Sequence, residues 1–218
     1  MGLAPGRSAR GRCWSSIAQN SEDPPMPASI SLVRHAEKQL GSGAPYGVSA
    51  DGNQDPDSLT PRGWQRAGAL VGLFVPRRDT DTSGLPTPTR LFASEVGPHS
   101  HSRRPQETLR PISERLGIPL DEPFLQDELD PLVDAVRASD GHVLIAWEHK
   151  RIPLIVNQLV DDPASVPQIW PDDRFDVVWV VEPVPGSPVF ALRQVPQLLL
   201  GGDREDMIGQ DSSSTREM

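Results

Sequence analysis

The 218-residue sequence has a single cysteine, Cys13, which excludes a disulfide framework and a site built from several thiolates. It also lacks an apolar run long enough for the core of a signal peptide or for a membrane span. Both absences suit a reducing compartment. We therefore predict a cytoplasmic protein without a membrane partner.

Basic residues are also fewer than acidic residues. The chain has 21 Lys and Arg against 30 Asp and Glu, which gives a formal net charge of −9. This balance disfavours a broad nucleic-acid-binding surface, and we expect no nucleic-acid partner. Any basic patch must be local, as a pocket for a phosphate group would be. The oligomeric state stays open.

Composition divides the chain into three parts. Residues 1–26 are rich in Gly, Ser, Arg and Pro and are predicted to be a disordered leader, either an extension or a misread start before a functional start at Met26. A targeting peptide is the alternative. Residues 201–218, with their acidic and serine residues, are predicted to be a disordered tail. The remaining residues, 27–200, are enough for one catalytic domain with a sizeable core.

Strand-like and helix-like segments alternate in the central part. Thr60 and Pro61 are typical of a helix start, and apolar residues then recur at helical spacing up to Val75. A second helix is predicted from Arg104 to Leu116, and strands at 175–181 and 189–195 are predicted to form a hairpin. The pattern predicts a single three-layer α/β/α domain with a mostly parallel central sheet.

Basic residues follow three of the apolar, strand-like runs. Open α/β sheets bind ligands at the carboxyl ends of their strands, so these residues are predicted to meet at one edge. The runs and residues are 30–33 with Arg34 and His35, 90–94 with Arg104, and 142–147 with His149.

Arginine and histidine together indicate phosphoryl chemistry. A guanidinium group offers a fixed fork of donors to phosphate oxygens, and a neutral imidazole can act as a nucleophile near pH 7. A phosphoryl group in transfer carries negative charge on its oxygens, so positioned cations and donors supply most of the catalysis. For His35 to attack, one ring nitrogen must be unprotonated, and we expect the other to donate to a backbone carbonyl.

Four motifs occur in one order over most of residues 29–160. They are Leu-Val-Arg-His-Ala-Glu-Lys at 32–38, Leu-Thr-Pro-Arg-Gly at 59–63, Arg-Pro-Gln-Glu-Thr at 104–108, and an apolar strand that ends just before His149.

With these motifs the sequence resembles the histidine phosphatase superfamily. The resemblance implies a phosphoglycerate mutase-like fold and a metal-independent enzyme without a cofactor. It implies that His35 is transiently phosphorylated, while Arg34, Arg104 and His149 hold the phosphoryl group. The implied substrate is a phosphorylated small molecule or a phosphoprotein.

Two positions depart from the family pattern or leave it ambiguous. Ala36 stands where the family commonly has glycine, which adds a methyl group near the substrate. Arg103 is adjacent to Arg104 and is the alternative phosphate ligand, although the spacing to the Gln-Glu-Thr sequence favours Arg104.

The proton donor for the leaving oxygen is less well defined. The family usually takes it from an acidic residue beyond the second arginine. The interval that contains Asp127 and Glu128 fits this position, and we favour Glu128. Asp127 and Glu148, next to His149, are the alternatives.

The loop histidines His99 and His101 could be a metal pair, but no further ligands with recognisable spacing accompany them. We predict no metal site, and His101 as a substrate contact. The preferred function is hydrolysis of a phosphomonoester. The alternatives are a catalytically weak phosphate-binding or regulatory module of the same fold, and a phosphomutase.

Overall fold

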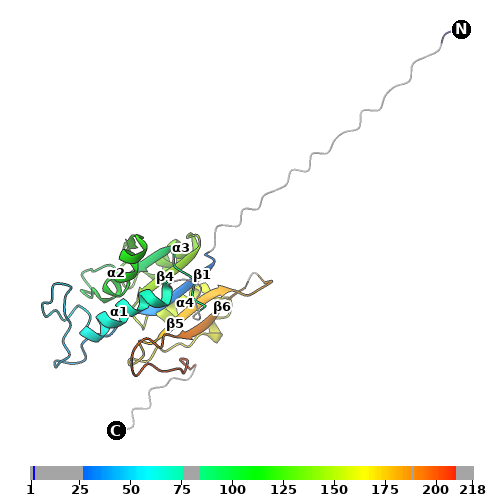
Figure 1. The fold of residues 1–218 in the computed structure, drawn as a ribbon. Coiled ribbons are helices and arrows are strands. Elements are labelled where there is room, and N and C mark those ends of the chain that lie inside the picture. Colours follow the sequence, from blue (N-terminus) through cyan, green and yellow to red (C-terminus); the bar gives the residue numbers. More distant parts are fainter. Residues whose placement is uncertain (1, 3–26, 76–83, 188, 210–218) are drawn as a thin grey trace.

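A six-stranded sheet lies at the centre of the structure, a computed structural model that describes residues 2, 27–75, 84–187 and 189–209 (Figure 1). The strands are β1 (Ser29–Arg34), β2 (Arg90–Ala93), β3 (Leu120–Asp121), β4 (His142–Trp147), β5 (Val177–Pro183) and β6 (Phe190–Pro196). The helices are α1 (Pro61–Phe74), α2 (Arg104–Leu116), α3 (Leu129–Arg137) and α4 (Ile152–Leu159), with a 3-10 turn at Pro163–Ser165.

The strand order is β3-β2-β4-β1-β5-β6. The pairs β3/β2, β2/β4 and β4/β1 are parallel, whereas β1/β5 and β5/β6 are antiparallel. Helices α1, α2 and α3 lie between successive strands of the parallel part in the sequence. The predicted mostly parallel sheet is therefore confirmed, and so is the predicted hairpin of β5 and β6.

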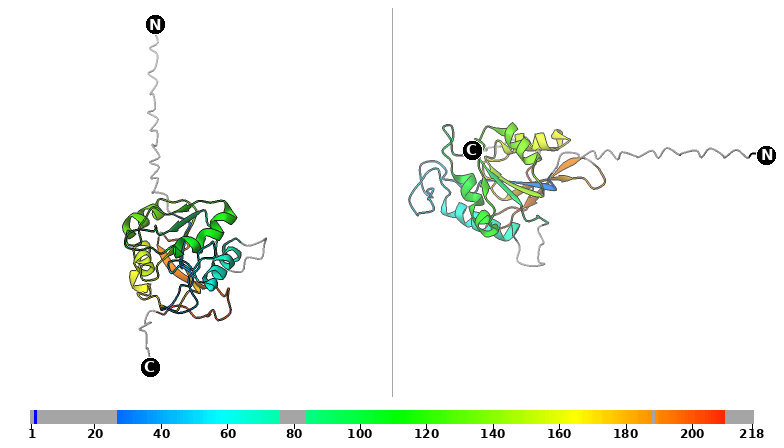
Figure 2. Two further views of the ribbon diagram at one scale, coloured as in Figure 1. Left: turned by 90° about the vertical axis from the view of Figure 1, so that its left-hand side faces the viewer. Right: turned by 90° about the horizontal axis from the view of Figure 1, so that it is seen from above.

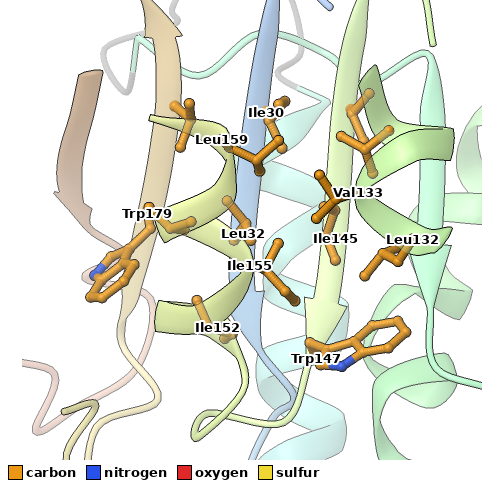
Figure 3. Close-up of a cluster of buried hydrophobic side chains, with 14 of the residues drawn as sticks. Ile30, Leu32, Leu132, Val133, Ile145, Trp147, Ile152, Ile155, Leu159 and Trp179 are labelled. Atoms are coloured by element: carbon orange, nitrogen blue, oxygen red, sulfur yellow. The ribbon is translucent and has the colours of Figure 1, made fainter. Parts of the chain in front are cut away.

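The two faces of the sheet follow from side-chain alternation along the strands. On one face Leu32 and Ile145 pack with α3 and α4, as Figure 3 shows. On the other face Val33 and Leu144 pack with α1 and α2. The views in Figure 2 show helices on both sides of the sheet. The predicted three-layer α/β/α arrangement is confirmed.

Local sequence signals explain where α1 begins and where α2 ends. The Thr60 side chain accepts a hydrogen bond from the Gly63 backbone N–H at 3.3 Å, which caps α1. A Cβ atom at Gly63 would lie 2.5 Å from the Glu37 carbonyl oxygen, so only glycine allows this close approach to the segment after β1. Helix α2 ends at Gly117 in the left-handed conformation, with φ 67°.

The carboxyl ends of β1, β2 and β4 meet at one edge of the sheet. The backbone N–H of His35 donates to the carbonyl of Trp147 at 3.0 Å, which aligns the ends of β1 and β4.

Across the described ranges, every helix is too short or too polar to cross a bilayer.

The C-terminal segment 201–209 packs on the domain, so the predicted boundary at residue 200 is wrong. Ile208 is buried, Asp203 pairs with the buried Arg66, and Asp206 pairs with the buried Arg174. Asp203 and Asp206 were part of the acidic pattern that predicted a solvated tail, but in the structure they form ion pairs with buried arginines. The rest of the predicted tail, and the predicted leader apart from Gly2, lie outside the described residues.

Removing the Asp203 carboxylate should destabilise the domain. Both of its oxygens accept hydrogen bonds from Arg66, at 2.7 and 3.0 Å. Loss of one partner of a buried ion pair costs about 3–5 kcal/mol. Because Glu37 still pairs with Arg66, we expect the lower end of that range for Asp203→Ala in urea unfolding.

The matched control is Glu205→Ala, which removes the same charge from an exposed residue two positions away. A similar loss in both variants would show that net charge, and not the buried pair, determines stability.

Candidate active site

His35 directly follows β1 and is buried. Its Nδ1 lies 2.8 Å from the carbonyl oxygen of Ala36. A carbonyl oxygen can only accept, so Nδ1 carries the proton and Nε2 keeps its lone pair. This arrangement meets the expectation of a backbone carbonyl that fixes the tautomer, and it identifies that carbonyl as the one of Ala36.

The surroundings of His35 keep its imidazole neutral. Burial lowers the pKa of His35 well below its usual value, and the positive charge of Arg34 lowers it further. Arg104 and Lys38 add smaller effects of the same sign, whereas the hydrogen bond to Ala36 opposes them. The ring is therefore neutral at neutral pH, with Nε2 free of a proton, as a nucleophile requires.

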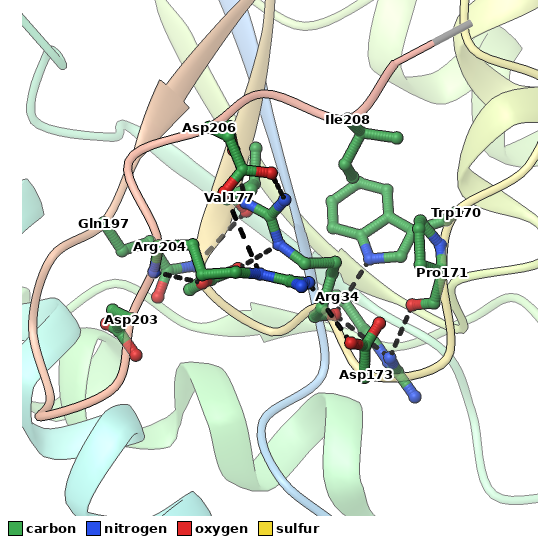
Figure 4. Close-up of polar contacts among 12 residues, drawn as sticks. Arg34, Trp170, Pro171, Asp173, Val177, Gln197, Asp203, Arg204, Asp206 and Ile208 are labelled. Carbon is green, nitrogen blue, oxygen red and sulfur yellow. Dashed lines mark hydrogen bonds and ion pairs between the residues drawn. The ribbon is translucent and has the colours of Figure 1, made fainter. Parts of the chain in front are cut away.

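Arg34 is buried next to His35 and held on one side. Its Nη1 donates to the carbonyl oxygen of Pro171 at 3.2 Å (Figure 4). It also donates to the carbonyl oxygens of Asp172 and Arg174 at 2.7 and 3.0 Å. Its guanidinium carbon lies 3.7 Å from the centre of the Phe175 ring. Burial lowers the pKa of Arg34 to about 10, so the group stays charged at neutral pH.

Arg104 is the first residue of α2, where the helix dipole also favours an anion. Its Nη2 donates to the carbonyl of Pro56 at 3.0 Å, and its charge acts on His35. The neighbouring Arg103 is exposed and pairs with Asp55 at 2.6 Å. The structure therefore brings Arg104, and not the alternative Arg103, to His35.

The hydroxyl of Thr108 connects the segment of His35 to Arg104. Thr108 Oγ1 accepts from the Ala36 backbone N–H at 2.9 Å and donates to the Arg104 carbonyl at 2.7 Å. The backbone of Ala36, whose carbonyl orients His35, is thus fixed to α2. Sequence reasoning did not assign this role, although Thr108 lies one helical turn after Arg104.

Glu107 holds the segment before α1 against α2. Its buried carboxylate accepts hydrogen bonds from the Ser58 hydroxyl at 2.7 Å and from the Leu59 backbone N–H at 2.8 Å. The same segment includes Pro56, the carbonyl partner of Arg104. Glu107 therefore supports the position of Arg104 indirectly.

His149 follows β4 and is buried between two carboxylates. Its Nε2 lies 2.6 Å from Asp172 Oδ1, and its Nδ1 lies 3.1 Å from Glu148 Oε1 without the geometry of a hydrogen bond. Burial raises the pKa of Glu148, but contact with His149 and Lys150 outweighs it and leaves the pKa below its usual value. The hydrogen bond with His149 likewise lowers the pKa of Asp172.

Several buried polar atoms at this edge have no hydrogen-bond partner among the described residues. They are Nε and Nη2 of Arg34, Nε of Arg104, Nδ1 of His149 and the hydroxyl of Ser102. An unsatisfied buried polar group is costly and is rare without a functional reason. Four of these five atoms belong to the three residues predicted to hold a phosphoryl group.

A cavity of about 790 Å³ opens beside His149 and Phe175. Its volume falls within the range of small-molecule sites, about 300–1,000 Å³. Its walls are formed by Glu37, Lys38, Leu40, Arg62, Arg66, Glu148, His149, Lys150, Asp172, Asp173, Phe175, Asp176, Gly202, Asp203 and Arg204.

Glu128 is not brought together with these residues. It is exposed at the start of α3, where Oε2 accepts from the Leu125 backbone N–H at 2.9 Å. Together with Asp127 it borders a different hollow, near Leu154. Among the three acidic candidates, only Glu148 borders the cavity beside His149. The Glu128 carboxylate instead accepts a hydrogen bond within its own loop.

His101 is exposed in the loop before α2, and no described contact connects it to His35. The neighbouring His99 borders a separate cavity of about 100 Å³. Within the described ranges, no cluster of three or more His, Cys, Asp or Glu side chains is arranged to hold a metal ion.

No protein-family model matches the chain, and no curated protein matches it. Among solved structures, a protein assigned as phosphohistidine phosphatase SixA from Agrobacterium tumefaciens is similar, with 14% identity and a TM-score of 0.43 over 77% of this chain and 96% of that one. A protein described as mycobacterial hydrolase 2 has 13% identity and a TM-score of 0.42 over 77% of this chain and 88% of that one.

The Thr108 hydroxyl should matter for turnover more than for substrate binding. In Thr108→Val the side chain keeps its shape but loses both hydrogen bonds, so the Ala36 carbonyl no longer fixes His35. We expect kcat for an aryl phosphate to fall roughly tenfold to a hundredfold, the effect of about 1–3 kcal/mol of lost orientation, with a smaller change in KM.

Thr108→Ser is the matched control, because it keeps the hydroxyl and should retain most of the activity. Equal losses in the two variants would show that the methyl group, and not the hydroxyl, is important.

Proposed function

We propose that this chain is a phosphomonoester hydrolase that works through a phosphohistidine on His35. The observation that carries the proposal is the set of unpartnered buried guanidinium donors on Arg34 and Arg104, next to a neutral His35 imidazole of fixed tautomer. Donors of this kind suit the oxygens of a phosphoryl group and stabilise its charge during transfer.

In the first step the Nε2 lone pair of His35 forms a bond to phosphorus, and the bond from phosphorus to the ester oxygen breaks. The leaving oxygen takes up a proton from water in the cavity. The two guanidinium groups and His149 compensate the charge on the phosphoryl oxygens. The phosphoryl group is then held on His35.

In the second step a water molecule attacks the phosphohistidine and releases inorganic phosphate. Glu148 is the proposed acceptor of the proton from this water. Its pKa lies below the usual value, so the carboxylate is ionised at neutral pH and suits a general base. It also lies close enough to Arg34 for their charges to interact.

The first test compares wild type, His35→Ala and wild type with EDTA in the hydrolysis of an aryl phosphate. We expect His35→Ala to lose roughly a thousandfold or more in kcat, as removal of a nucleophile does, and EDTA to have no effect. Wild type quenched in alkali should carry one phosphoryl group on the peptide that contains His35, detected by mass spectrometry.

His142→Gln is the control, because His142 lies at the opposite end of β4 from His149. Activity that persists in His35→Ala would contradict the nucleophile, and loss with EDTA would favour a metallohydrolase. Phosphate binding without release by folded wild type would favour a binding module.

The choice of base is tested by Glu148→Gln. We expect phosphohistidine to accumulate and steady-state turnover to fall about 10²–10⁴-fold, the usual range for a lost general base. A burst of released phenol followed by slow turnover would show it in stopped flow.

Glu128→Gln serves as the comparison and should leave turnover nearly unchanged. If Glu128→Gln were the impaired variant and Glu148→Gln were active, Glu148 would not be the base, and Glu128, the proton donor chosen from the sequence, would be the carboxylate that turnover needs.

A further inference from the structure

The two lysines of this chain border the same cavity. Of 21 Lys and Arg residues, 19 are arginine, and only Lys38 and Lys150 are lysine. Both belong to the walls of the 790 Å³ cavity beside His149. Lys38 follows the nucleophile by three residues, and Lys150 follows His149 directly.

In the described part of the chain, these two lysines are the charged residues of the cavity wall that lack a close partner of opposite charge. Among the described residues, neither ammonium group has a carboxylate within 4.0 Å, although Glu148 and Asp172 attract both at longer range. Every carboxylate of the cavity wall, by contrast, has a cationic or imidazole partner within that distance. The pairs are Glu37 with Arg62 and Arg66, Asp203 with Arg66, Asp176 with Arg174, Asp173 with Arg204, and both Glu148 and Asp172 with His149.

The lysines also differ from the arginines in what they can bind. A lysine ammonium is a compact charge on a flexible stem, with three donors that rotate to meet an anion. Arg66 is already engaged by Glu37 and Asp203 through several hydrogen bonds. Lys38 is partly buried near Arg34 and Arg104, and this burial and these charges lower its pKa. A second anion would relieve that repulsion.

The C-terminal segment borders the cavity at Gly202, Asp203 and Arg204. Asp203 is fixed by Arg66, and the Arg204 backbone N–H donates to Asp176 at 2.7 Å (Figure 4). The ring of Phe175 also borders the cavity and contacts Arg34. An aromatic surface, His149 and the two lysines thus border the same cavity.

We propose that Lys38 and Lys150 bind a second anionic group, a carboxylate or a further phosphate, on the leaving portion of the substrate. This inference rests on the proposed function of the same site. The substrate class is a phosphomonoester whose phosphate is joined through an organic spacer to another anion. The spacer lies along Phe175, and the second anion lies at the ammonium groups.

Substrate comparison tests the proposal. We expect kcat/KM to be about tenfold higher for 3- or 4-carboxyphenyl phosphate, or for 1,4-phenylene diphosphate, than for phenyl phosphate, as one charge-assisted hydrogen bond allows. The carboxylate and diphosphate arms show which second anion is preferred. In Lys38→Met and Lys150→Met this ratio should fall toward one, and Lys38→Arg and Lys150→Arg should retain part of it.

Arg115→Met is the matched control, because it removes one positive charge from an exposed position near the end of α2 and should keep the wild-type ratio. A wild-type ratio near one for all three esters, or an unchanged ratio in both lysine-to-methionine variants, would overturn the proposal while leaving the phosphatase in place.

Lysine acetylation separates this inference from the hydrolytic function. With the two lysines and the chain's amino terminus as the acetylation sites, mass spectrometry can follow each one in wild type with phenylphosphonate or 4-phosphonobenzoate, which are not hydrolysed. Stronger protection of Lys38 and Lys150 by 4-phosphonobenzoate supports the second anion site even if no ester is turned over. Equal protection by both ligands contradicts it.

Discussion

The backbone of Ala36 is the point on which the site depends. Its carbonyl accepts from His35 Nδ1, and its N–H donates to Thr108, which in turn donates to the Arg104 carbonyl. These two groups belong to the successive peptides on either side of the Ala36 Cα atom, so a change in the backbone at Ala36 would release the imidazole and separate it from the helix that carries Arg104. Because Ala36 is buried, each of these hydrogen bonds would have to be replaced within the protein. His35 and Arg104 are therefore positioned together.

The second constraint is the burial of arginine. Arg34 needs carbonyl acceptors from the segment before β5, and Arg174 supplies one of them. The Arg174 side chain is held by Asp176 and by Asp206 of the C-terminal segment. Burying a guanidinium is costly unless its charge and its donors are matched. The C-terminal segment thus helps to fix the loop on which Arg34 rests, beyond its contribution to stability.

The sequence predicts what depends on neighbours along the chain. Apolar runs and helix start and stop signals locate the strands and the helices α1 and α2. Because open α/β sheets bind ligands at the carboxyl ends of their strands, the sequence also predicts that Arg34, His35, Arg104 and His149 lie at one edge of the sheet. What it misses depends on distant partners. Asp203 and Arg66 are 137 residues apart, so an acidic tail could not be distinguished from a packed segment. The hydrogen bond from the Leu125 backbone N–H to Glu128, which holds this carboxylate on its own loop, could likewise not be predicted from the sequence.

His149 shows how such a site can stay stable while its donors remain available. Its Nε2 is engaged by Asp172, whose side chain is 83% exposed. Because this carboxylate is largely solvated, a phosphate dianion can compete with Asp172 at small cost. The Arg34 and Arg104 donors have no comparable protein partner to displace. Binding of a phosphate would therefore replace one weak contact, that of Asp172 with His149, and would give hydrogen-bond acceptors to the buried donors of Arg34 and Arg104. The site therefore favours a phosphoryl group over the Asp172 carboxylate.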